Sequence, residues 1–595
     1  MNIYAKRIHS LRYLMMQSNI HVYMVLTSDP HLSEYLPKFY QSRQWLSGFS
    51  GSSGILVVTQ GYAGLWTDGR YWIQADKELQ GSTIDLQRQD SANNVIKWLC
   101  ENIDQNQTLA TDFKVLSLSM QLDLKKALKD KNISVLHKDL ITTLWIDREP
   151  LCHNKIYEHI HCVRDRQENL VQLREKMRRI NADYHILASL DDIAWLCNLR
   201  GSDITYNPVF MCFFLLSMQK AILFVKLDSI SIELQAKLKK DGIDTMDYED
   251  VDSVLNDISN CSILLDSNKI SAHLGNIIEQ NNHIIDDNNP SQLLKACKND
   301  LEIENIKDAM RHDGIALCNF FAWLEDSLEN NERVSELDIA KMLSYFRAKN
   351  PLYISDSFAT IAGFNANGAQ PHYSASSDSF AYIESHGLLL IDSGGQYSNG
   401  TTDITRVVPI GKPSVEQVKD YTLVLKAHIA LASASFPIDI PMPFLDSICR
   451  AILWNNQINY FHGTGHGVGY FLNVHEGPQV ISCYANALPK TQAKIGMLSS
   501  IEPGIYRTGK WGIRLENLVV NTRVSNPKEN EFGEFLCFDV LTLCPFETSC
   551  IDTSLLNQDE KKWLNDYHKK VRQNLESSLQ GRAREWLLQR TNEIL

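Results

Sequence analysis

Residues 461–469 read Phe461-His462-Gly463-Thr464-Gly465-His466-Gly467-Val468-Gly469, so glycine occupies every second position around two histidines. Because glycine has no Cβ, its backbone can approach another group closely. A histidine between two glycines is therefore well placed to reach a ligand. This stretch decides our interpretation of the fold, because acidic residues lie on both sides of it in the sequence.

Two aspartates precede the stretch and two glutamates follow it. Asp392 ends the apolar run 388–391, and Glu502 ends the run 498–501. A carboxylate at the end of a buried strand is costly unless it is paired or binds a metal. Asp403 follows Asp392 by eleven residues, and a hairpin-like strand pair would bring these two carboxylates together. Taken singly, each of these acids is more often a cap, a turn residue or an edge charge.

Glu516 lies in the run 513–520, where the alternation predicts a strand with Glu516 and Arg514 on one face. Four crowded carboxylates cannot all stay ionised without counter-charge. Two divalent cations balance four negative charges, so we expect Asp392, Asp403, His466, Glu502 and Glu516 to hold a pair of metal ions. Four oxygen ligands and one imidazole favour Mn²⁺ and tolerate Co²⁺ or Zn²⁺. Such a pair can hold a shared hydroxide as nucleophile.

Composition excludes several other classes of protein. The net charge is −13, spread along 595 residues, which disfavours nucleic acid or an anionic membrane as the main partner. Thirteen cysteines without a C-x-x-C pair indicate reduced thiols in a cytoplasm. The N-terminus does not have the pattern of a signal peptide, and the most apolar run, 209–218, is too short for a membrane span. We therefore predict a cytoplasmic protein.

Three domains are expected from the order of strands and helices. Residues 1–145 alternate strands with helices, which predicts an α/β domain. Residues 146–290 repeat this order, with the strand at 184–188 corresponding to the one at 21–26. We favour a duplicated domain, although two common α/β units can resemble each other by chance. Asn288-Asn289-Pro290 has the composition of a boundary, so the third domain covers 291–595.

Helices are predicted at several places in the third domain. Asn299 and Asp300 can cap a helix over 301–328, and Ser335 with Asp338 forms a capping box. Another helix is expected over 414–433. The tail 558–595 carries an apolar stripe, which either packs on the chain's own core or forms a dimer contact.

The sequence resembles the long, three-domain, cytosolic Xaa-Pro aminopeptidases, also called aminopeptidase P. They are metallopeptidases with the pita-bread catalytic fold. The similarity extends over essentially the whole chain. In the third domain it is carried by the run 461–469, by Leu472-Asn473-Val474-His475-Glu476-Gly477-Pro478, by Ser500-Ile501-Glu502-Pro503-Gly504 and by Gly512-Ile513-Arg514-Leu515-Glu516-Asn517. Two further motifs lie near the N-terminus: Ser47-Gly48-Phe49-Ser50-Gly51-Ser52 and Trp66-Thr67-Asp68-Gly69-Arg70-Tyr71.

The resemblance implies the fold class and the reaction. The class is α/β and α+β, with two creatinase-N-terminal-like α/β domains before a pita-bread catalytic domain that has a C-terminal helical extension. The implied activity removes the N-terminal residue from peptides with proline at the second position, using a metal-bridging hydroxide. The implied assembly is a homodimer. The glycines of 461–469 would then leave clearance for a peptide entering beside the ions.

The resemblance also implies a role for each site residue. Asp392 would bind one metal only, and Asp403 and Glu516 would bridge both. His466 and Glu502 would complete the shell of the other ion, and Glu502 would also move a proton from the water to the leaving amine. Three further histidines match the pattern: His372 and His475 would stabilise the tetrahedral intermediate, and His462 would shape the substrate pocket.

Two alternatives belong to the same fold. A prolidase would cleave only Xaa-Pro dipeptides, and an inactive peptide-binding relative would have lost the metal ligands. Nucleotide binding at the glycine-rich run is disfavoured, because the G-x-x-G spacing and an acidic residue after a βαβ unit are missing.

Overall fold

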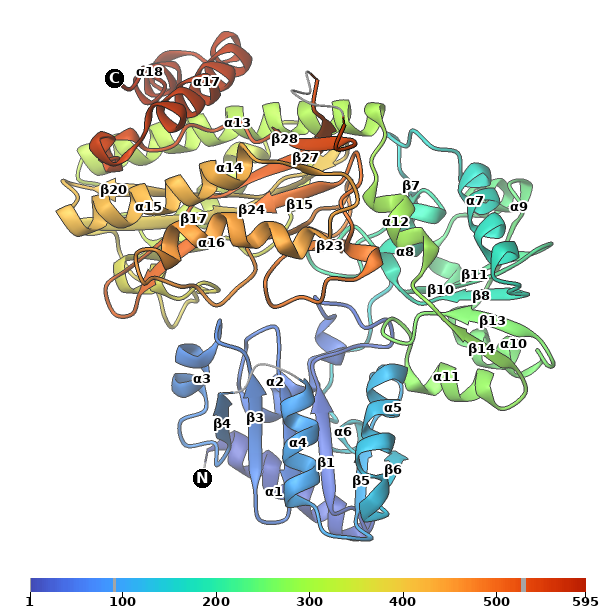
Figure 1. The fold of residues 1–595 in the computed structure, drawn as a ribbon. Helices are drawn as coiled ribbons and strands as arrows, with labels where there is room; N and C mark the ends of the chain where they lie inside the picture. The colour runs from blue at the N-terminus through green and yellow to red at the C-terminus, as the bar shows by residue number, and fades with distance from the viewer. Residues whose placement is uncertain (1, 89–91, 526–530) are drawn as a thin grey trace. The chain divides into compact units, whose positions relative to one another are not determined.

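The computed structural model describes residues 2–88, 92–525 and 531–595 (Figure 1). It contains two compact units, Met1–Ser291 and Gln292–Leu595. The short helix α12 (Pro290–Ala296) contains the point of division.

The first unit begins with an α/β domain built on a six-stranded sheet. The strands, in spatial order, are β4 (Asp85–Arg88), β3 (Ala63–Thr67), β2 (Ile55–Thr59), β1 (Val22–Leu26), β5 (Thr108–Thr111) and β6 (Ser134–His137). The helices are α1 (Ile3–Gln17), α2 (Ser42–Ser47), α3 (Trp72–Glu78), α4 (Ala92–Asn102), α5 (Leu118–Ala127) and α6 (Ile141–Leu144). The central strand β1 is buried along its whole length, which explains its continuous apolar sequence.

A second α/β domain follows in the same unit. Its sheet has the order β12 (Ile243–Met246), β11 (Ala221–Val225), β10 (Cys212–Ser217), β8 (Tyr184–Leu187), β13 (Ser262–Leu265) and β14 (His283–Asp286). Its helices are α7 (Arg166–Arg179), α8 (Leu190–Leu196), α9 (Ile232–Lys240), α10 (Val251–Asn256) and α11 (Ala272–Glu279), and a small ribbon pairs β7 (Tyr157–Glu158) with β9 (Leu199–Arg200).

The two sheets have the same topology strand for strand. In the first sheet, β1 runs antiparallel to β2 and parallel to β5. In the second, β8 runs antiparallel to β10 and parallel to β13. The remaining pairs agree as well, since β3 with β4 and β11 with β12 are both parallel. The prediction of two similar α/β domains is therefore confirmed.

The second unit is an α+β domain with long helices. They are α13 (Asp300–Glu329), α14 (Glu336–Arg347), α15 (Val415–Ala432), α16 (Asp446–Trp454), α17 (Gln558–Leu575) and α18 (Gly581–Arg590). Asn299 and Glu302 form a capping box at α13, and Ser335 and Asp338 form one at α14. These two helix starts lie where the capping residues predicted them.

The described residues of the second unit form four sheets. The largest has the order β21 (Ser435–Pro437), β28 (Phe535–Val540), β27 (Asn517–Arg523), β24 (Leu498–Ile501), β22 (Gly465–Gly467) and β23 (Glu476–Ile481). A second sheet has the order β16 (Ile361–Phe364), β17 (Gly387–Ser393) and β20 (Ile404–Ile410). A third has the order β15 (Tyr353–Asp356), β18 (Gly395–Tyr397) and β19 (Gly400–Thr401). The fourth pairs β25 (Gly504–Arg507) with β26 (Trp511–Arg514).

The prediction of one strand over 513–520 is wrong. Strand β26 ends at Arg514 and β27 begins at Asn517, and the two belong to different sheets. Leu515 and Glu516 form the crossing between them, and the Glu516 N–H donates to the Thr405 carbonyl 3.1 Å away. Apolar and polar residues continue to alternate in the sequence through the point where the chain passes from one sheet to the other. The alternation alone therefore does not show that the strand ends there.

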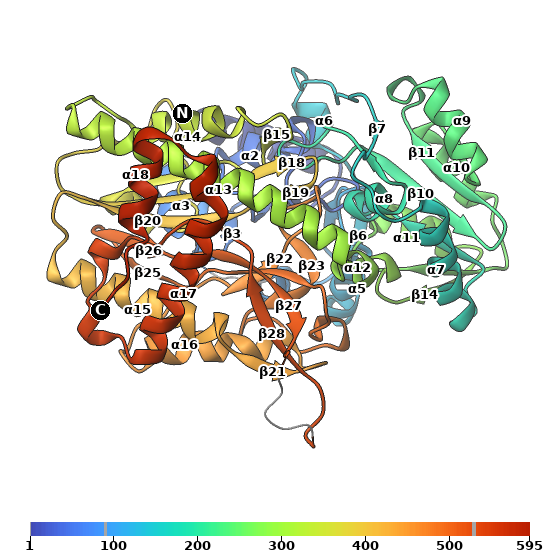
Figure 2. The ribbon, with the colours of Figure 1, turned by 90° about the horizontal axis from the view of Figure 1, so that it is seen from above.

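The C-terminal helices cover α13 in the second unit (Figure 2). The Trp586 ring stacks on Phe321 with centroids 5.2 Å apart, and its indole N–H donates to Glu325. The buried face of α17 includes Leu564, Tyr567, Val571 and Leu575. The apolar stripe of the tail therefore packs on the chain's own core.

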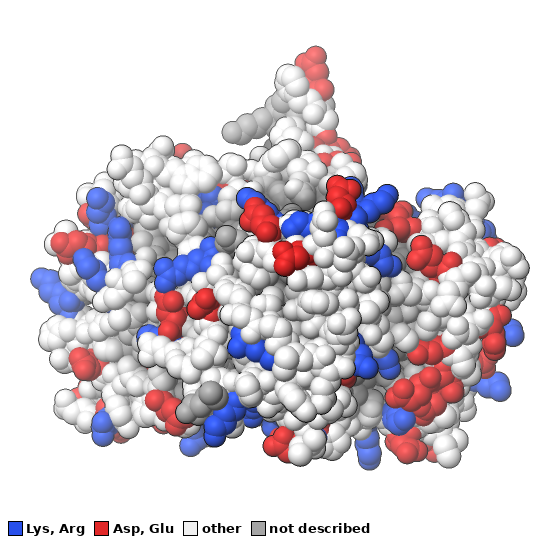
Figure 3. All heavy atoms as spheres, turned by 90° about the horizontal axis from the view of Figure 1, so that it is seen from below, with Lys and Arg blue, Asp and Glu red and all other residues white. Residues whose placement is uncertain are grey.

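Acidic and basic side chains are interspersed on the face drawn in Figure 3, as the dispersed charge of the sequence predicts. Within the described residues, no helix has both the length and the apolar character of a membrane-crossing segment.

Candidate metal centre

Asp392 and Asp403 are brought together by an antiparallel strand pair in the second unit. Asp392 lies in β17 and pairs in register with Thr405 of β20. Asp403 directly precedes β20, so it lies at the same end of this strand pair as Asp392. The predicted hairpin-like pairing of these strands is therefore present, and it places two carboxylates at one end of a buried sheet.

The two glutamates reach the same place from a different sheet. Glu502 directly follows β24, and its N–H donates to the Thr464 carbonyl at 2.7 Å. Glu516 lies at the crossing before β27, and its Oε2 accepts from the Thr405 hydroxyl at 2.8 Å. These hydrogen bonds fix the glutamates against the backbone of β20 and of the glycine-rich run.

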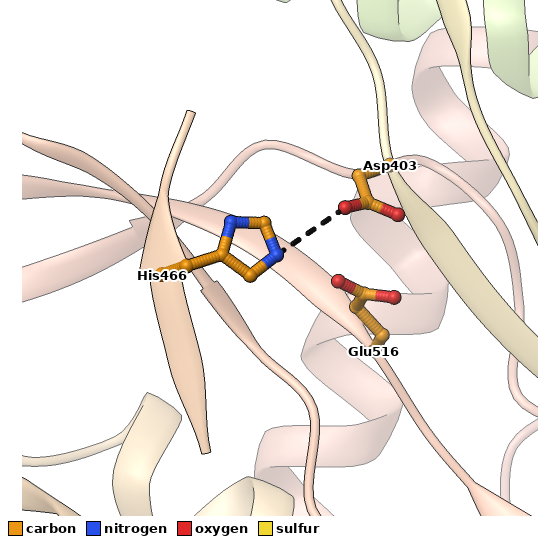
Figure 4. Close-up of side chains that lie close together, drawn as sticks. All are labelled: Asp403, His466 and Glu516. Carbon is orange, nitrogen blue, oxygen red and sulfur yellow. Dashed lines mark ion pairs between the residues drawn. The ribbon is translucent and has the colours of Figure 1, made fainter. Parts of the chain in front are cut away.

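Asp403, His466 and Glu516 form the tightest cluster, with one potential ligand atom from each lying within 4.8 Å of the others (Figure 4). His466 Nε2 lies 3.5 Å from Asp403 Oδ2 and 3.5 Å from Glu502 Oε1. His466 Nδ1 lies 2.9 Å from the Gly467 carbonyl, which can only accept a hydrogen bond. Nδ1 therefore carries a proton, and Nε2 is the ring nitrogen that faces the carboxylates, where a metal ion could replace its proton.

The carboxylates are poorly compensated by protein charges. Burial raises the pKa of Asp392 to about 7, with contributions from Asp403 and Glu502. Burial and the other acids also raise the pKa of Glu502 and hold that of Glu516 well above its usual range. Desolvation acts to lower the pKa of His466, but Asp403 and Glu502 overcome it and raise the value to about 9. A cluster of this kind needs additional positive charge.

Arg514 is a site residue to which the sequence analysis assigned no role. Its guanidinium forms a short ion pair with Asp392 and donates to the Tyr506 hydroxyl at 2.8 Å and to the Pro371 carbonyl at 3.3 Å. Among the four acids, Arg514 forms a direct ion pair with Asp392, and its charge also lowers the pKa of Glu502 and Glu516 without offsetting their burial. Its position two residues before Glu516 in a short motif was the only sequence signal for it.

Two buried carboxylate oxygens of this acidic cluster have no hydrogen-bond donor within the part of the chain that the structure describes. They are Asp392 Oδ1 and Glu516 Oε1. An unsatisfied anionic oxygen in the interior is strongly unfavourable. Together with His466 Nε2, which lies beside Asp403 and Glu502, these oxygens fit a divalent metal centre with hard ligands.

Glycines within 461–469 allow neighbouring strands to pack closely. This packing explains why glycine is needed there, without the expected clearance for a peptide. A Cβ on Gly465 would lie 2.0 Å from the Ser500 carbonyl oxygen, in β24. A Cβ on Gly467 would lie 2.3 Å from the Glu476 carbonyl oxygen, in β23. Gly465 and Gly467 therefore let β22 lie between two strands and hold His466 beside the acids.

The His475 ring lies edge-on to His466, with centroids 4.3 Å apart. The next residue, Glu476, is buried, and its carboxylate lies 2.6 Å from Lys298 Nζ and 3.6 Å from Lys295 Nζ. This buried ion pair anchors the segment that carries His475. His475 is thus placed beside the cluster by a rigid contact.

His462 lies farther along the same wall. Its Nε2 lies 2.8 Å from the hydroxyl of Tyr506, which also receives the Arg514 hydrogen bond. His372 follows Pro371, whose carbonyl accepts from Arg514. His462 and His372 are therefore linked through Arg514 to the same set of acids.

A buried arginine connects the C-terminal region to Glu516. Arg406 donates to the Glu516 carbonyl at 2.6 Å, to the Asn517 side chain at 2.7 Å and to the Tyr567 hydroxyl at 3.0 Å. Tyr567 belongs to α17, so the C-terminal helices support the crossing that holds Glu516.

Family comparisons agree with this arrangement. Residues 304–523 match the model of metallopeptidase family M24, and residues 534–594 match the C-terminal region of that family. Residues 7–142 and 147–302 each match a creatinase/prolidase N-terminal domain. These matches confirm the predicted fold class, with two related α/β domains before a metallopeptidase domain.

Individual relatives extend over nearly the whole chain. A probable Xaa-Pro aminopeptidase P of Laccaria bicolor is 37% identical over 601 residues, covering 98% of this chain and 92% of that protein. Xaa-Pro aminopeptidase 1 of Dictyostelium discoideum is 36% identical, covering 95% of this chain and 92% of its own length. The crystal structure of an X-prolyl aminopeptidase from Caenorhabditis elegans, described as a cytosolic enzyme with a di-nuclear active site, superposes with a TM-score of 0.94 at 30% identity and covers 100% of both chains.

The close approach at Gly465 gives a test of how β22 is packed. Because a Cβ would collide with the Ser500 carbonyl, we expect Gly465→Ala to lower the free energy of unfolding by about 1–3 kcal/mol. Urea denaturation measures this change. Gly61→Ala is the matched control, because a Cβ there meets nothing within 4 Å. Equal stability of the two variants would contradict the packing argument.

The uncompensated charge gives a second test. Glu516→Gln removes one buried negative charge, so we expect the metal-free protein to melt at a higher temperature than the wild type. The increase in the free energy of unfolding that Mn²⁺ causes should become smaller, because the variant lacks one metal ligand. For comparison, a metal ion at a concentration of a hundred times its Kd raises the free energy of unfolding by about 2.7 kcal/mol. Thermal melts with a chelator and with Mn²⁺ measure both effects. The exposed Glu332→Gln is the control, and an undiminished Mn²⁺ effect in Glu516→Gln would exclude Glu516 as a ligand.

Proposed function

Because the chain belongs to the Xaa-Pro aminopeptidase family of the M24 metallopeptidases, we propose that it removes the N-terminal residue from peptides with proline at the second position. It is a metal-dependent aminopeptidase. The observation that carries the chemistry is the cluster of Asp403, His466 and Glu516 with Asp392 and Glu502 beside it, in which burial raises the pKa of three of the four acids.

Two divalent ions are the proposed cofactor, and Mn²⁺ is the proposed metal. Asp392 would hold one ion, Asp403 and Glu516 would bridge both, and His466 and Glu502 would complete the second. The unpaired oxygens of Asp392 and Glu516 support this assignment, as does the di-nuclear site described for the Caenorhabditis elegans enzyme. When bound, the ions supply an activated water and a Lewis acid for the scissile carbonyl.

Proton transfer falls to Glu502 in this proposal. Its carboxylate lies 3.5 Å from His466 and accepts a bond from the Ser500 hydroxyl at 3.4 Å, so it is held in place beside the ligands. Burial raises its pKa, which makes it a better acceptor for the proton of the attacking water. Glu502 then passes this proton to the leaving proline nitrogen, which departs as an amine.

His475 and His372 are proposed to donate hydrogen bonds to the oxyanion that develops on the carbonyl. His475 lies against His466, so its ring is placed beside the proposed metal ligands. Preorganised donors of this kind stabilise the transition state without reorganisation. His462, bonded to Tyr506, is proposed to line the substrate pocket.

The proposal extends to organisation and location. We propose domain divisions after residues 145 and 290, a homodimer, and a cytosolic location. The two creatinase/prolidase matches support the division after 145, and the compact unit that ends at Ser291 supports the one after 290. The cytosolic description of the Caenorhabditis elegans relative supports the location.

A panel of three peptides tests the specificity. The account predicts that manganese-loaded protein hydrolyses Ala-Pro-Ala and releases free alanine, while Ala-Ala-Ala is hydrolysed far more slowly. Amino-acid analysis of the products measures both rates. Turnover confined to the dipeptide Ala-Pro would assign a prolidase instead, and full activity after removal of the metal would exclude metal-dependent hydrolysis.

His475 separates transition-state stabilisation from metal binding. We expect His475→Ala to lower kcat on Ala-Pro-Ala by roughly 10²–10³-fold, as for the loss of one oxyanion donor. The bound metal should remain unchanged, because His475 is not among the proposed ligands. Elemental analysis and steady-state kinetics check the two parts. The exposed His386→Ala is the control, and an unchanged kcat in His475→Ala would remove His475 from the mechanism.

A further inference from the structure

A cavity of about 300 Å³ lies within the first unit, between its two α/β domains. One wall comes from the carboxyl ends of the parallel strands β1, β5 and β6, where Asp112 follows β5 and Asp139 follows β6. The opposite wall includes Tyr248, which follows β12, and His273, which lies in the first turn of α11. Ligands of open α/β sheets bind beyond the carboxyl ends of the strands, and cavities between domains are common binding sites.

The two walls are held together by direct contacts. The backbone N–H of His273 donates to the Phe113 carbonyl at 3.0 Å, and Ser117 forms a β-bridge with Ser271. On another side, the buried ring of His31 contacts the Tyr248 hydroxyl and the Ala188 carbonyl, both at 2.9 Å. Burial lowers the pKa of His31 to about 3, so this link is neutral. The cavity is therefore preformed, which limits the ordering cost of binding.

Negative charge exceeds positive charge around the cavity. Four lining residues are acidic, namely Asp112, Asp139, Glu249 and Asp252, whereas the lining lysine and arginine are Lys114 and Arg148. The guanidinium N–H groups of Arg148 donate to the Phe39 carbonyl and to the hydroxyls of Ser42 and Thr142, while its charge still acts on Asp112 and Asp139.

Asp112 has weaker side-chain contacts than Asp139, whose carboxylate accepts hydrogen bonds from the backbone of Ile141 and Thr142. Asp112 Oδ1 accepts a hydrogen bond from the Lys114 backbone at 2.9 Å, and the closest ring nitrogen, His137 Nδ1, is 3.6 Å away. Burial raises the pKa of Asp112, and Asp139 raises it further. By contrast, Asp252 is paired with His273 at 2.7 Å.

Aromatic side chains complete the walls. Tyr40 and Tyr248 line the cavity together with Phe213, and the last two stack with centroids 5.1 Å apart. Burial raises the pKa of Tyr40 well above its usual range, and Asp29 and Asp112 add to this effect. Tyr40 is therefore a buried ring close to acidic side chains. Aromatic faces beside carboxylates attract organic cations through their quadrupoles as well as through charge.

We propose that this cavity binds a small organic cation with a protonated primary amine, which pairs with Asp112 and packs against Tyr40 and Tyr248. The polar ends of Asp112 and Asp139 suit the ammonium group, and the rings suit an aliphatic chain. The volume admits a molecule of a few carbon atoms. This site uses none of the residues assigned to hydrolysis, so it is independent of the proposed peptidase function.

The test uses the full-length protein and two probes of equal length, 1,4-diaminobutane and 1,4-butanediol. Isothermal titration calorimetry should detect binding of the diamine and not of the uncharged diol. Asp112→Asn should weaken diamine binding at least tenfold. It keeps the acceptor for the Lys114 backbone and removes a buried charge, so the fold should be retained, as circular dichroism checks. Asp123→Asn changes an exposed acid of α5 and should bind the diamine as the wild type does.

Glu249→Gln provides a second variant at an exposed position of the cavity wall, where the fold is not at risk. It should weaken diamine binding by a smaller factor than Asp112→Asn. Equal binding of diamine and diol would overturn the proposal, as would absence of diamine binding. Equal diamine affinity in the wild type, Asp112→Asn and Glu249→Gln would overturn it as well.

Discussion

The site depends on one electrostatic constraint, which is the crowding of four carboxylates in a buried volume with too little positive charge. Arg514 neutralises Asp392, and His466 offers one further charge between Asp403 and Glu502. Burial and mutual repulsion then raise the pKa of Asp392, Glu502 and Glu516. Such an arrangement destabilises the protein by itself and is explained when divalent ions complete it.

The fold resists this repulsion because each acid is held by a different rigid contact. Asp392 is part of a central strand, while Glu516 is fixed through its backbone to Thr405 and Arg406. Arg406 in turn bonds to Tyr567 of the C-terminal helices. Ligands supported in this way keep their geometry when the charge around them changes. The C-terminal region therefore contributes to the site without supplying a ligand.

Much of this could be predicted from local sequence signals. Capping residues marked the starts of α13 and α14, and the ends of apolar runs marked Asp392 and Glu502. The repeated order of strands indicated the duplicated α/β domains, whose sheets have matching topologies. The roles of the site residues came from motifs that resemble a known family, because spacing alone left each acid open to a structural explanation.

Features that depend on distant segments were not predictable in the same way. The break at Leu515-Glu516 exists because the chain moves to another sheet, which alternation does not record. The need for Gly465 and Gly467 comes from carbonyls of β24 and β23, which are contributed by later parts of the chain. The cavity beside Asp112 is lined by residues of both α/β domains, so the sequence of neither domain alone indicates it.

The central claim is that these four acids and His466 hold two ions, and anomalous diffraction tests it most directly. Crystals of the wild-type protein grown with Mn²⁺ should give two anomalous peaks per chain, about 3.5–4 Å apart, in contact with Asp403 and Glu516. One of the peaks should also contact Asp392, and the other His466 and Glu502. A single peak, or peaks that do not contact these side chains, would contradict the account.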